Sequence, residues 1–134
     1  MKLVIDSNIL FSFFRKESLT RELVTNFVFE LYTPSFALEE LSKHKVMISA
    51  KAGLSAKGFE EILEKLCIFI KIEEDSDYSG FLNEAHELCP DPDDVDFFAI
   101  ALKYKCPLWS NDAALKKQPK IRVLSTKDVL EIVG

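Results

Sequence analysis

Short apolar segments with strand-like composition alternate with longer amphipathic segments along the whole sequence. The strand-like segments are 3–5, 31–33, 107–110 and 122–124, and 67–72 fits either a strand or an extended connector. Strands that alternate with helices form βαβ units, and right-handed crossovers place the helices on both faces of a parallel sheet. The pattern therefore predicts an α/β fold, a three-layer α/β/α sandwich with a central, mainly parallel sheet.

The length and composition fit a single globular domain over residues 1–134. No low-complexity stretch, charge run or repeat marks a linker. No apolar run approaches about 18 residues, so no membrane-spanning helix is expected. The N-terminus lacks the pattern of a secretory signal, which favours a cytoplasmic protein. The three widely spaced cysteines form no zinc pattern, and we expect them to be reduced and mostly buried.

Polar residues next to the apolar segments predict where helices begin and end. Ser7 or Asn8 is expected to cap a helix after the first strand. Ser35 is expected to cap a helix that runs on to Gly53. Residues 75–89 have the spacing of one amphipathic helix.

Another helix start lies in a segment with two prolines. Asp91 is a natural N-cap and Pro92 a natural first residue, because proline fits the first turn of a helix. The helix that follows, to about Tyr104, is nearly all apolar after its acidic start, so we expect it to be deeply buried. Three further helices are expected to be capped at Ser18 or Thr20, at Ser55, and at Ser125 or Thr126.

Acidic residues stand where parallel strands are expected to end. Asp6 ends the first strand, Asp112 follows the strand at 107–110, and Asp94 lies in the first turn of the buried helix. The carboxyl ends of parallel strands and the starts of the following helices gather at one edge of a sheet. These three carboxylates can therefore converge. Glu40 lies about one and a half turns into its helix, and it joins them only if that helix crosses the same edge.

A cluster of carboxylates needs a counter-charge, because like charges raise one another's pKa. Hard divalent cations supply it, and Mg²⁺ suits a site with few carboxylates, water and a substrate phosphate. Such an ion lowers the pKa of bound water and stabilises charge on a phosphate. The formal net charge of −5 does not exclude a nucleic-acid partner, since four unpaired carboxylates would contribute −4 of it. The sequence shows no Ser-His-Asp or Cys-His arrangement and no glycine-rich phosphate loop.

Four segments together resemble the motifs of PIN-domain nucleases in order and spacing. They are residues 3–10 (LVIDSNIL), 39–41 (EEL), 93–102 (DDVDFFAIAL) and 108–112 (LWSND). The resemblance implies a metal-dependent endoribonuclease that acts on single-stranded RNA with Mg²⁺ or Mn²⁺. Many small stand-alone members, the VapC-type proteins, are toxins that an antitoxin holds inactive.

The resemblance also implies roles for residues that match the motifs by position. The implied catalytic acids are Asp6, Glu40, Asp94 and Asp112, of which Asp6, Asp94 and Asp112 would bind the metal. Asn8 and Ser110 would support Asp6, Asp112 or the bound water by hydrogen bonds. The family mechanism is in-line attack of metal-activated water on a phosphodiester, which leaves a 5′-phosphate and a 3′-hydroxyl.

Two of the motifs contain neighbouring acids that remain alternatives. The third motif has Asp93, Asp94 and Asp96, and the two alanines that follow align Asp94 with the family's acid. Asp96 remains a supporting candidate next to the metal. Asp93 and Asp94 would also complement a helix dipole without any metal. In the second motif, Glu39 directly precedes Glu40.

Other functions fit parts of the same pattern. A non-catalytic PIN-like RNA- or protein-binding module would keep the fold without turnover. An aspartyl-phosphate phosphohydrolase also begins with a strand that ends in aspartate, but it needs a second aspartate where Asn8 stands. The cations that would bind phosphates or only aid solubility are Arg15, Lys16, Lys43, Lys45, Lys116 and Lys117. The phenylalanines expected to form an exposed homodimer or partner surface are Phe11, Phe13, Phe14, Phe27 and Phe29.

Overall fold

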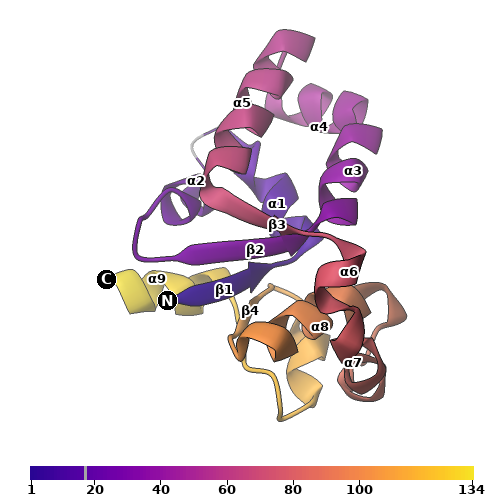
Figure 1. Ribbon diagram of the computed structural model, residues 1–134. Coiled ribbons are helices and arrows are strands. Elements are labelled where there is room, and N and C mark those ends of the chain that lie inside the picture. The colour runs from indigo at the N-terminus through magenta and orange to yellow at the C-terminus, as the bar shows by residue number, and fades with distance from the viewer. Residues whose placement is uncertain (17) are drawn as a thin grey trace.

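Parallel strands form the centre of the computed structural model, which describes residues 1–16 and 18–134 (Figure 1). The strands in this part of the chain are β1 (Lys2–Ile5), β2 (Glu30–Pro34), β3 (Ile70–Glu73), β4 (Leu108–Trp109) and β5 (Val123–Leu124). Their order in the sheet is β3-β2-β1-β4-β5, and every neighbouring pair is parallel. The predicted α/β/α sandwich with a parallel sheet is therefore confirmed.

Helices connect the strands and cover the sheet. The α-helices are α1 (Ser7–Phe13), α2 (Leu19–Val24), α3 (Ser35–Lys43), α4 (Lys45–Ala52), α5 (Ala56–Phe69), α6 (Asp75–Tyr78), α7 (Leu82–Leu88), α8 (Val95–Tyr104) and α9 (Thr126–Val133). Short 3₁₀ helices are η1 (Ser79–Phe81), η2 (Pro92–Asp94) and η3 (Ala113–Lys117). Helix α8 packs against β1, β2 and β4, with α6 and α7 next to it, and α1 lies on the other side of the sheet (Figure 1).

The central strand β1 is buried on both faces. Leu3, Val4 and Ile5 are each 0% exposed, as expected for a parallel strand with helices on both sides. Helix α8 is apolar between Asp96 in its first turn and Lys103 in its last turn, and its residues from Phe97 to Ala101 are buried. Burial of these two elements fixes where the residues at their ends must lie.

The predicted helix starts are confirmed at several caps and wrong at two. Ser55 and Ser125 accept hydrogen bonds from backbone amides of their own helices, as does Ser18. Before α1, however, the cap is Asp6 and not Ser7 or Asn8. The helix already begins at Ser7, so Asp6 is the residue whose carboxylate accepts the Ile9 amide. Ser35 is the first residue of α3, and Pro34 occupies the capping position without a side-chain bond.

Two predicted helices are interrupted in the structure. The helix after β2 breaks at His44 into α3 and α4, and Lys45 in α4 pairs with Glu60 in α5 at 2.9 Å. Helix α4 packs against α5 and buries Ile48. Residues 75–89 divide into α6, η1 and α7, and the break contains Gly80, which disfavours a continuous helix by about 1 kcal/mol relative to alanine.

Several predictions of burial and exposure are also wrong. Helix α5 runs on to Phe69, which places Cys67 on the surface, whereas Cys106 is buried as expected. Phe13, Phe14 and Phe29 are buried, and Phe11 is partly buried against the core. Among the five phenylalanines expected on a partner surface, Phe27 alone is exposed. Within residues 1–16 and 18–134, no helix combines the length and apolar character needed to cross a membrane.

Candidate metal centre

Three predicted acids lie together at the carboxyl edge of the sheet. Asp6 directly follows β1, Asp112 follows β4 after two residues, and Asp94 stands between η2 and α8. The charges of Asp6 and Asp112 both raise the pKa of Asp94, and the charge of Asp112 raises the pKa of Asp6. The topology therefore gathers these carboxylates, which are far apart in the sequence, into one electrostatically coupled group.

Asp6 is fixed at the centre of this edge. Its side chain is buried, and its Oδ1 accepts a hydrogen bond of 3.0 Å from the Ile9 amide. Its own amide donates to the Trp109 carbonyl at 3.3 Å, which ties the end of β1 to β4. Burial raises the pKa of the Asp6 carboxyl, although hydrogen bonds from Ser110 and from the amides of Ile9 and Asn8 oppose this.

Ser110 and Asn8 occupy supporting positions around Asp6. Ser110 is 1% exposed, and its hydroxyl hydrogen-bonds Asp6 while its Oγ accepts the Asp112 amide at 3.1 Å. One hydroxyl therefore links two of the acids. Asn8 contributes its backbone amide to Asp6, and its side chain borders a neighbouring hollow.

Asp91 is a fourth member of the group that the sequence interpretation assigned only as a helix cap. Asp91, Asp94 and Asp112 each offer a carboxylate oxygen, and these oxygens all lie within 4.8 Å of one another. Asp91 also caps η2, because its Oδ1 accepts the Asp93 amide at 2.9 Å. Side chains three residues apart lie above one another on a 3₁₀ helix, which places Asp91 beside Asp94. The spacing of these two aspartates around Pro92 was the available signal.

The group carries negative charge without protein cations to balance it. Burial and the charges of Asp91, Asp6, Asp112 and Asp93 raise the pKa of Asp94 from 3.8 to about 6. Among the residues that the structure describes, no ion pair includes Asp6, Asp91, Asp94 or Asp112. Closely spaced carboxylate oxygens are ligands that hard divalent cations prefer, and such a cation would relieve the repulsion. The donor set therefore fits Mg²⁺ or Mn²⁺.

The remaining predicted acids lie outside this group. Glu40 in α3 is half-exposed, and it pairs with Lys43 at 3.6 Å and with His44 at 3.5 Å. Glu39 and Asp93 are exposed. The carboxylate of Asp96 instead accepts a hydrogen bond from the Tyr78 hydroxyl on α6.

A hollow of about 420 Å³ is lined by residues of α1 and α4, and Asp6, Asp91, Asp94 and Asp112 are not part of its lining. Asn8 and Asn111, which stand close to Asp6 and Asp112 in the sequence, line it. Its other lining residues are Phe11, Ser12, Phe14, Arg15, Met47, Ile48, Lys51 and Ala52. Arg15 and Lys16 also border a second hollow that contains Asn111. Lys43, Lys45 and Lys116, in contrast, form ion pairs with carboxylates.

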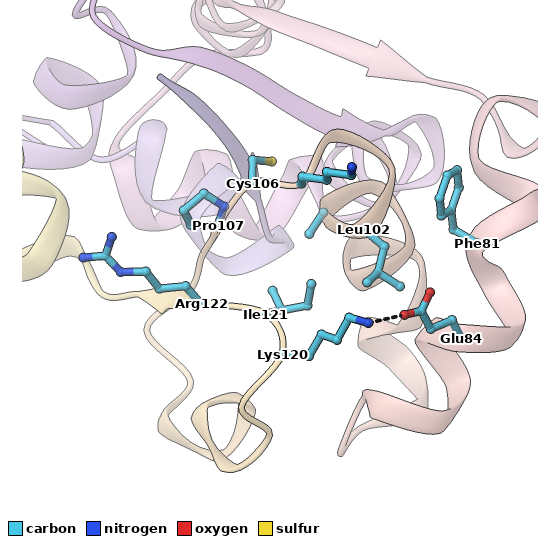
Figure 2. A pocket seen from close by; sticks show the side chains of 10 residues that line it. Phe81, Glu84, Leu102, Cys106, Pro107, Lys120, Ile121 and Arg122 are labelled. Atoms are coloured by element: carbon cyan, nitrogen blue, oxygen red, sulfur yellow. Dashed lines mark ion pairs between the residues drawn. The ribbon is translucent and has the colours of Figure 1, made fainter.

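A larger hollow of about 520 Å³ lies at the opposite ends of the strands (Figure 2). Cys106 and Pro107, just before β4, line it together with Ile121 and Arg122, just before β5. Figure 2 shows the ion pair of 2.9 Å between Lys120 and Glu84 beside it. The sheet separates this hollow from the acidic edge.

Comparisons with known proteins agree with the fold and the motifs. A fold similar to this one occurs in the crystal structure of VapBC2 from Rickettsia felis bound to a DNA fragment from their promoter. The match has a TM-score of 0.62 at 18% identity, and it covers 93% of this chain and 98% of that chain. A search of curated proteins finds no significant match. The family model described as PIN domain matches residues 4–127. The chain therefore belongs to the PIN-domain family.

Proposed function

We propose that this protein is a divalent-metal-dependent endoribonuclease that hydrolyses phosphodiester bonds of single-stranded RNA. The observation that carries the proposal is the set of carboxylate oxygens from Asp91, Asp94 and Asp112 within 4.8 Å, next to the buried Asp6. Such a group of like charges is costly for the fold and is expected where a cation binds.

The residues that would hold Mg²⁺ or Mn²⁺ are Asp6, Asp94 and Asp112, and we add Asp91 to this set. When bound, the cation would lower the pKa of a water molecule and stabilise negative charge on the phosphate. Ser110 would hold Asp6 and Asp112 in fixed positions relative to each other, since it hydrogen-bonds both residues. Asn8 would support Asp6 through its amide and face the substrate with its side chain.

Glu40 would orient the attacking water from α3. This helix follows directly after β2, so its first turns lie at the carboxyl edge of the sheet, where the other acids gather. The Glu40 carboxylate is half-exposed and pairs with Lys43 and His44 at 3.5–3.6 Å. Both pairs are long and accessible to solvent, so they leave the carboxylate free to exchange partners.

The hollow lined by Asn8 and Asn111 supports a nucleic-acid substrate. Arg15 and Lys51 can contact phosphates there, and Asn8 and Asn111 offer hydrogen bonds close to the acids. The rings of Phe11 and His44 form a T-shaped pair with centroids 6.0 Å apart, and such rings can stack on unpaired bases. A single strand fits this chemistry better than a duplex, because its bases are free to stack.

We further propose that an antitoxin protein regulates this enzyme. The proposal rests on membership in the PIN-domain family and on the fold shared with VapBC2, a pair of proteins solved on a fragment of their promoter. A homodimer remains a prediction, and an aromatic surface does not support it, because Phe13, Phe14 and Phe29 lie in the core.

The test compares the wild-type protein with Asp6→Asn on a panel of single-stranded RNAs in Mn²⁺, Mg²⁺ or EDTA. We expect metal-dependent cleavage that Asp6→Asn abolishes. Asp93→Asn is the matched control, since it removes an exposed aspartate next to the group and should matter far less than Asp94→Asn. Calorimetric Mn²⁺ binding without cleavage of any RNA would instead favour the non-catalytic binding module.

A further inference from the structure

A buried hydroxyl on α6 holds the first turn of α8. The Tyr78 hydroxyl lies 2.6 Å from Asp96 Oδ2 and 3.2 Å from Asp75 Oδ1, and Tyr78 is 1% exposed. Burial and the two carboxylates raise the pKa of Tyr78, so its hydroxyl keeps its proton and donates. A hydrogen bond of this length from a hydroxyl to a carboxylate is among the stronger kinds in proteins.

This hydrogen bond gives Asp96 a role different from that of Asp94. Side chains two residues apart on an α-helix point in nearly opposite directions, about 200° apart. Asp94 is the capping residue of α8, yet its side chain makes no capping bond, so its carboxylate is available to the acidic group. The Asp96 carboxylate is instead directed to Tyr78, on the α6 side of the helix.

The start of α8 needs such an anchor, because it carries part of a repelling group. Asp6 and Asp112 are fixed by strands β1 and β4, whereas Asp94 lies at the junction of a short 3₁₀ helix and α8. Repulsion from Asp6, Asp91 and Asp112 acts on this junction. We infer that Tyr78 is a positioning residue, whose hydrogen bond to Asp96 holds Asp94 within reach of a cation shared with Asp6 and Asp112. The inference rests on the proposed metal site.

Calorimetric titration with Mn²⁺ tests this inference on the wild type, Tyr78→Phe and Tyr104→Phe. Tyr104 is the last residue of α8, so Tyr104→Phe removes a hydroxyl from the same helix at the end away from the acids. We expect Tyr78→Phe to weaken Mn²⁺ binding about tenfold, as is usual when a residue that orients a metal ligand is lost, and Tyr104→Phe to change it less than twofold. Thermal unfolding in EDTA would show that both variants are folded at the temperature of the titration.

Asp96→Ala tests the same contact from its other side, and it replaces Tyr78→Phe if that variant does not fold. The double variant should bind Mn²⁺ no more weakly than the weaker single variant, since both changes break one hydrogen bond. Wild-type Mn²⁺ affinity in either single variant would overturn the role of Tyr78 and leave the metal site intact. An equal loss of Mn²⁺ affinity in Tyr78→Phe and Tyr104→Phe would do the same. A wild-type protein that binds no Mn²⁺ would overturn both proposals.

Discussion

At the scale of single residues, Asp6 combines a structural and a chemical task. Its Oδ1 caps α1 through the Ile9 amide, and the same carboxylate belongs to the acidic group. Asparagine has nearly the same shape and can still accept the capping bond, but it carries no charge. The two tasks can therefore be separated by one substitution.

We predict that Asp6→Asn unfolds in EDTA at a temperature no lower than the wild type, because it keeps the cap and removes one repelling charge. Cleavage should fall by about 100-fold or more, in the range seen when one electrostatic contribution is removed from an active site. Differential scanning calorimetry and a cleavage assay measure the two effects. Wild-type cleavage by this variant would contradict the assignment of Asp6.

Asp94 leads to a prediction about pH. Its pKa is raised from 3.8 to about 6 in the folded protein, so between these values the folded state holds a proton that the unfolded state has lost. Stability of the metal-free protein should therefore fall as the pH rises from about 4 to about 6. Mn²⁺ affinity should rise over the same range, because the cation competes with that proton.

Asp94→Asn is the variant that checks this assignment. It should flatten the fall in melting temperature between pH 4 and pH 6 in EDTA, since the residue no longer titrates. Thermal unfolding in a series of buffers measures the effect, with Asp93→Asn as the variant that should keep most of the slope. An unchanged slope in Asp94→Asn would place the titrating group elsewhere.

At the scale of elements, η2 and the start of α8 show how a local signal can conceal a second role. The sequence Asp91-Pro92 predicts a helix start, and the structure confirms that Asp91 caps η2. The capping role accounted fully for Asp91, so its three-residue spacing from Asp94 was not read as a sign of a second role. Only the one-turn 3₁₀ geometry, which the sequence did not predict, brings Asp91 beside Asp94.

Asp91→Asn and Asp91→Ala should separate these roles. Asparagine keeps the oxygen that accepts the Asp93 amide, so we predict native stability but Mn²⁺ affinity several-fold weaker than in the wild type. Alanine should show the same loss of affinity and an additional loss of stability of about 1 kcal/mol from the missing cap. Equal Mn²⁺ affinity in the wild type and Asp91→Asn would limit Asp91 to capping.

The other elements show where sequence patterns are sufficient and where they fail. Period and composition identified the strands β1, β2, β4 and β5 and the deeply buried α8, because these depend on local sequence. The sequence of residues 67–72 fits either a strand or a connector, and α5 extends to Phe69 before β3 begins at Ile70. Asp6, Asp94 and Asp112 could be placed together because parallel topology alone gathers them. The packing of α4 on α5 after the break at His44 and the anchor of Asp96 on Tyr78 are tertiary contacts, which no local pattern contains.

At the scale of the whole molecule, the two ends of the parallel strands differ in charge. The carboxyl ends of β1 and β4 carry the acidic group, whereas the hollow at the opposite ends of β4 and β5 is lined by Lys105, Lys120 and Arg122. Trp109 in β4 also donates to Thr126 in α9 at 3.1 Å, so the strand next to Asp112 is tied to the last helix. Repulsion among the acids is therefore opposed by the packing of the whole domain.

A divalent cation should consequently stabilise the entire fold. A ligand that binds only the folded state at 100 times its Kd contributes about 2.7 kcal/mol. For a chain of 134 residues, this corresponds to a rise in melting temperature of roughly 5–10 °C. We predict such a rise with Mn²⁺, its reversal by EDTA, and no rise with the same concentration of K⁺. Asp6→Asn should lose most of the rise and Asp93→Asn should keep it. An equal rise in both variants would mean that the cation binds outside the acidic edge, and that the repulsion between the carboxylates is relieved in another way.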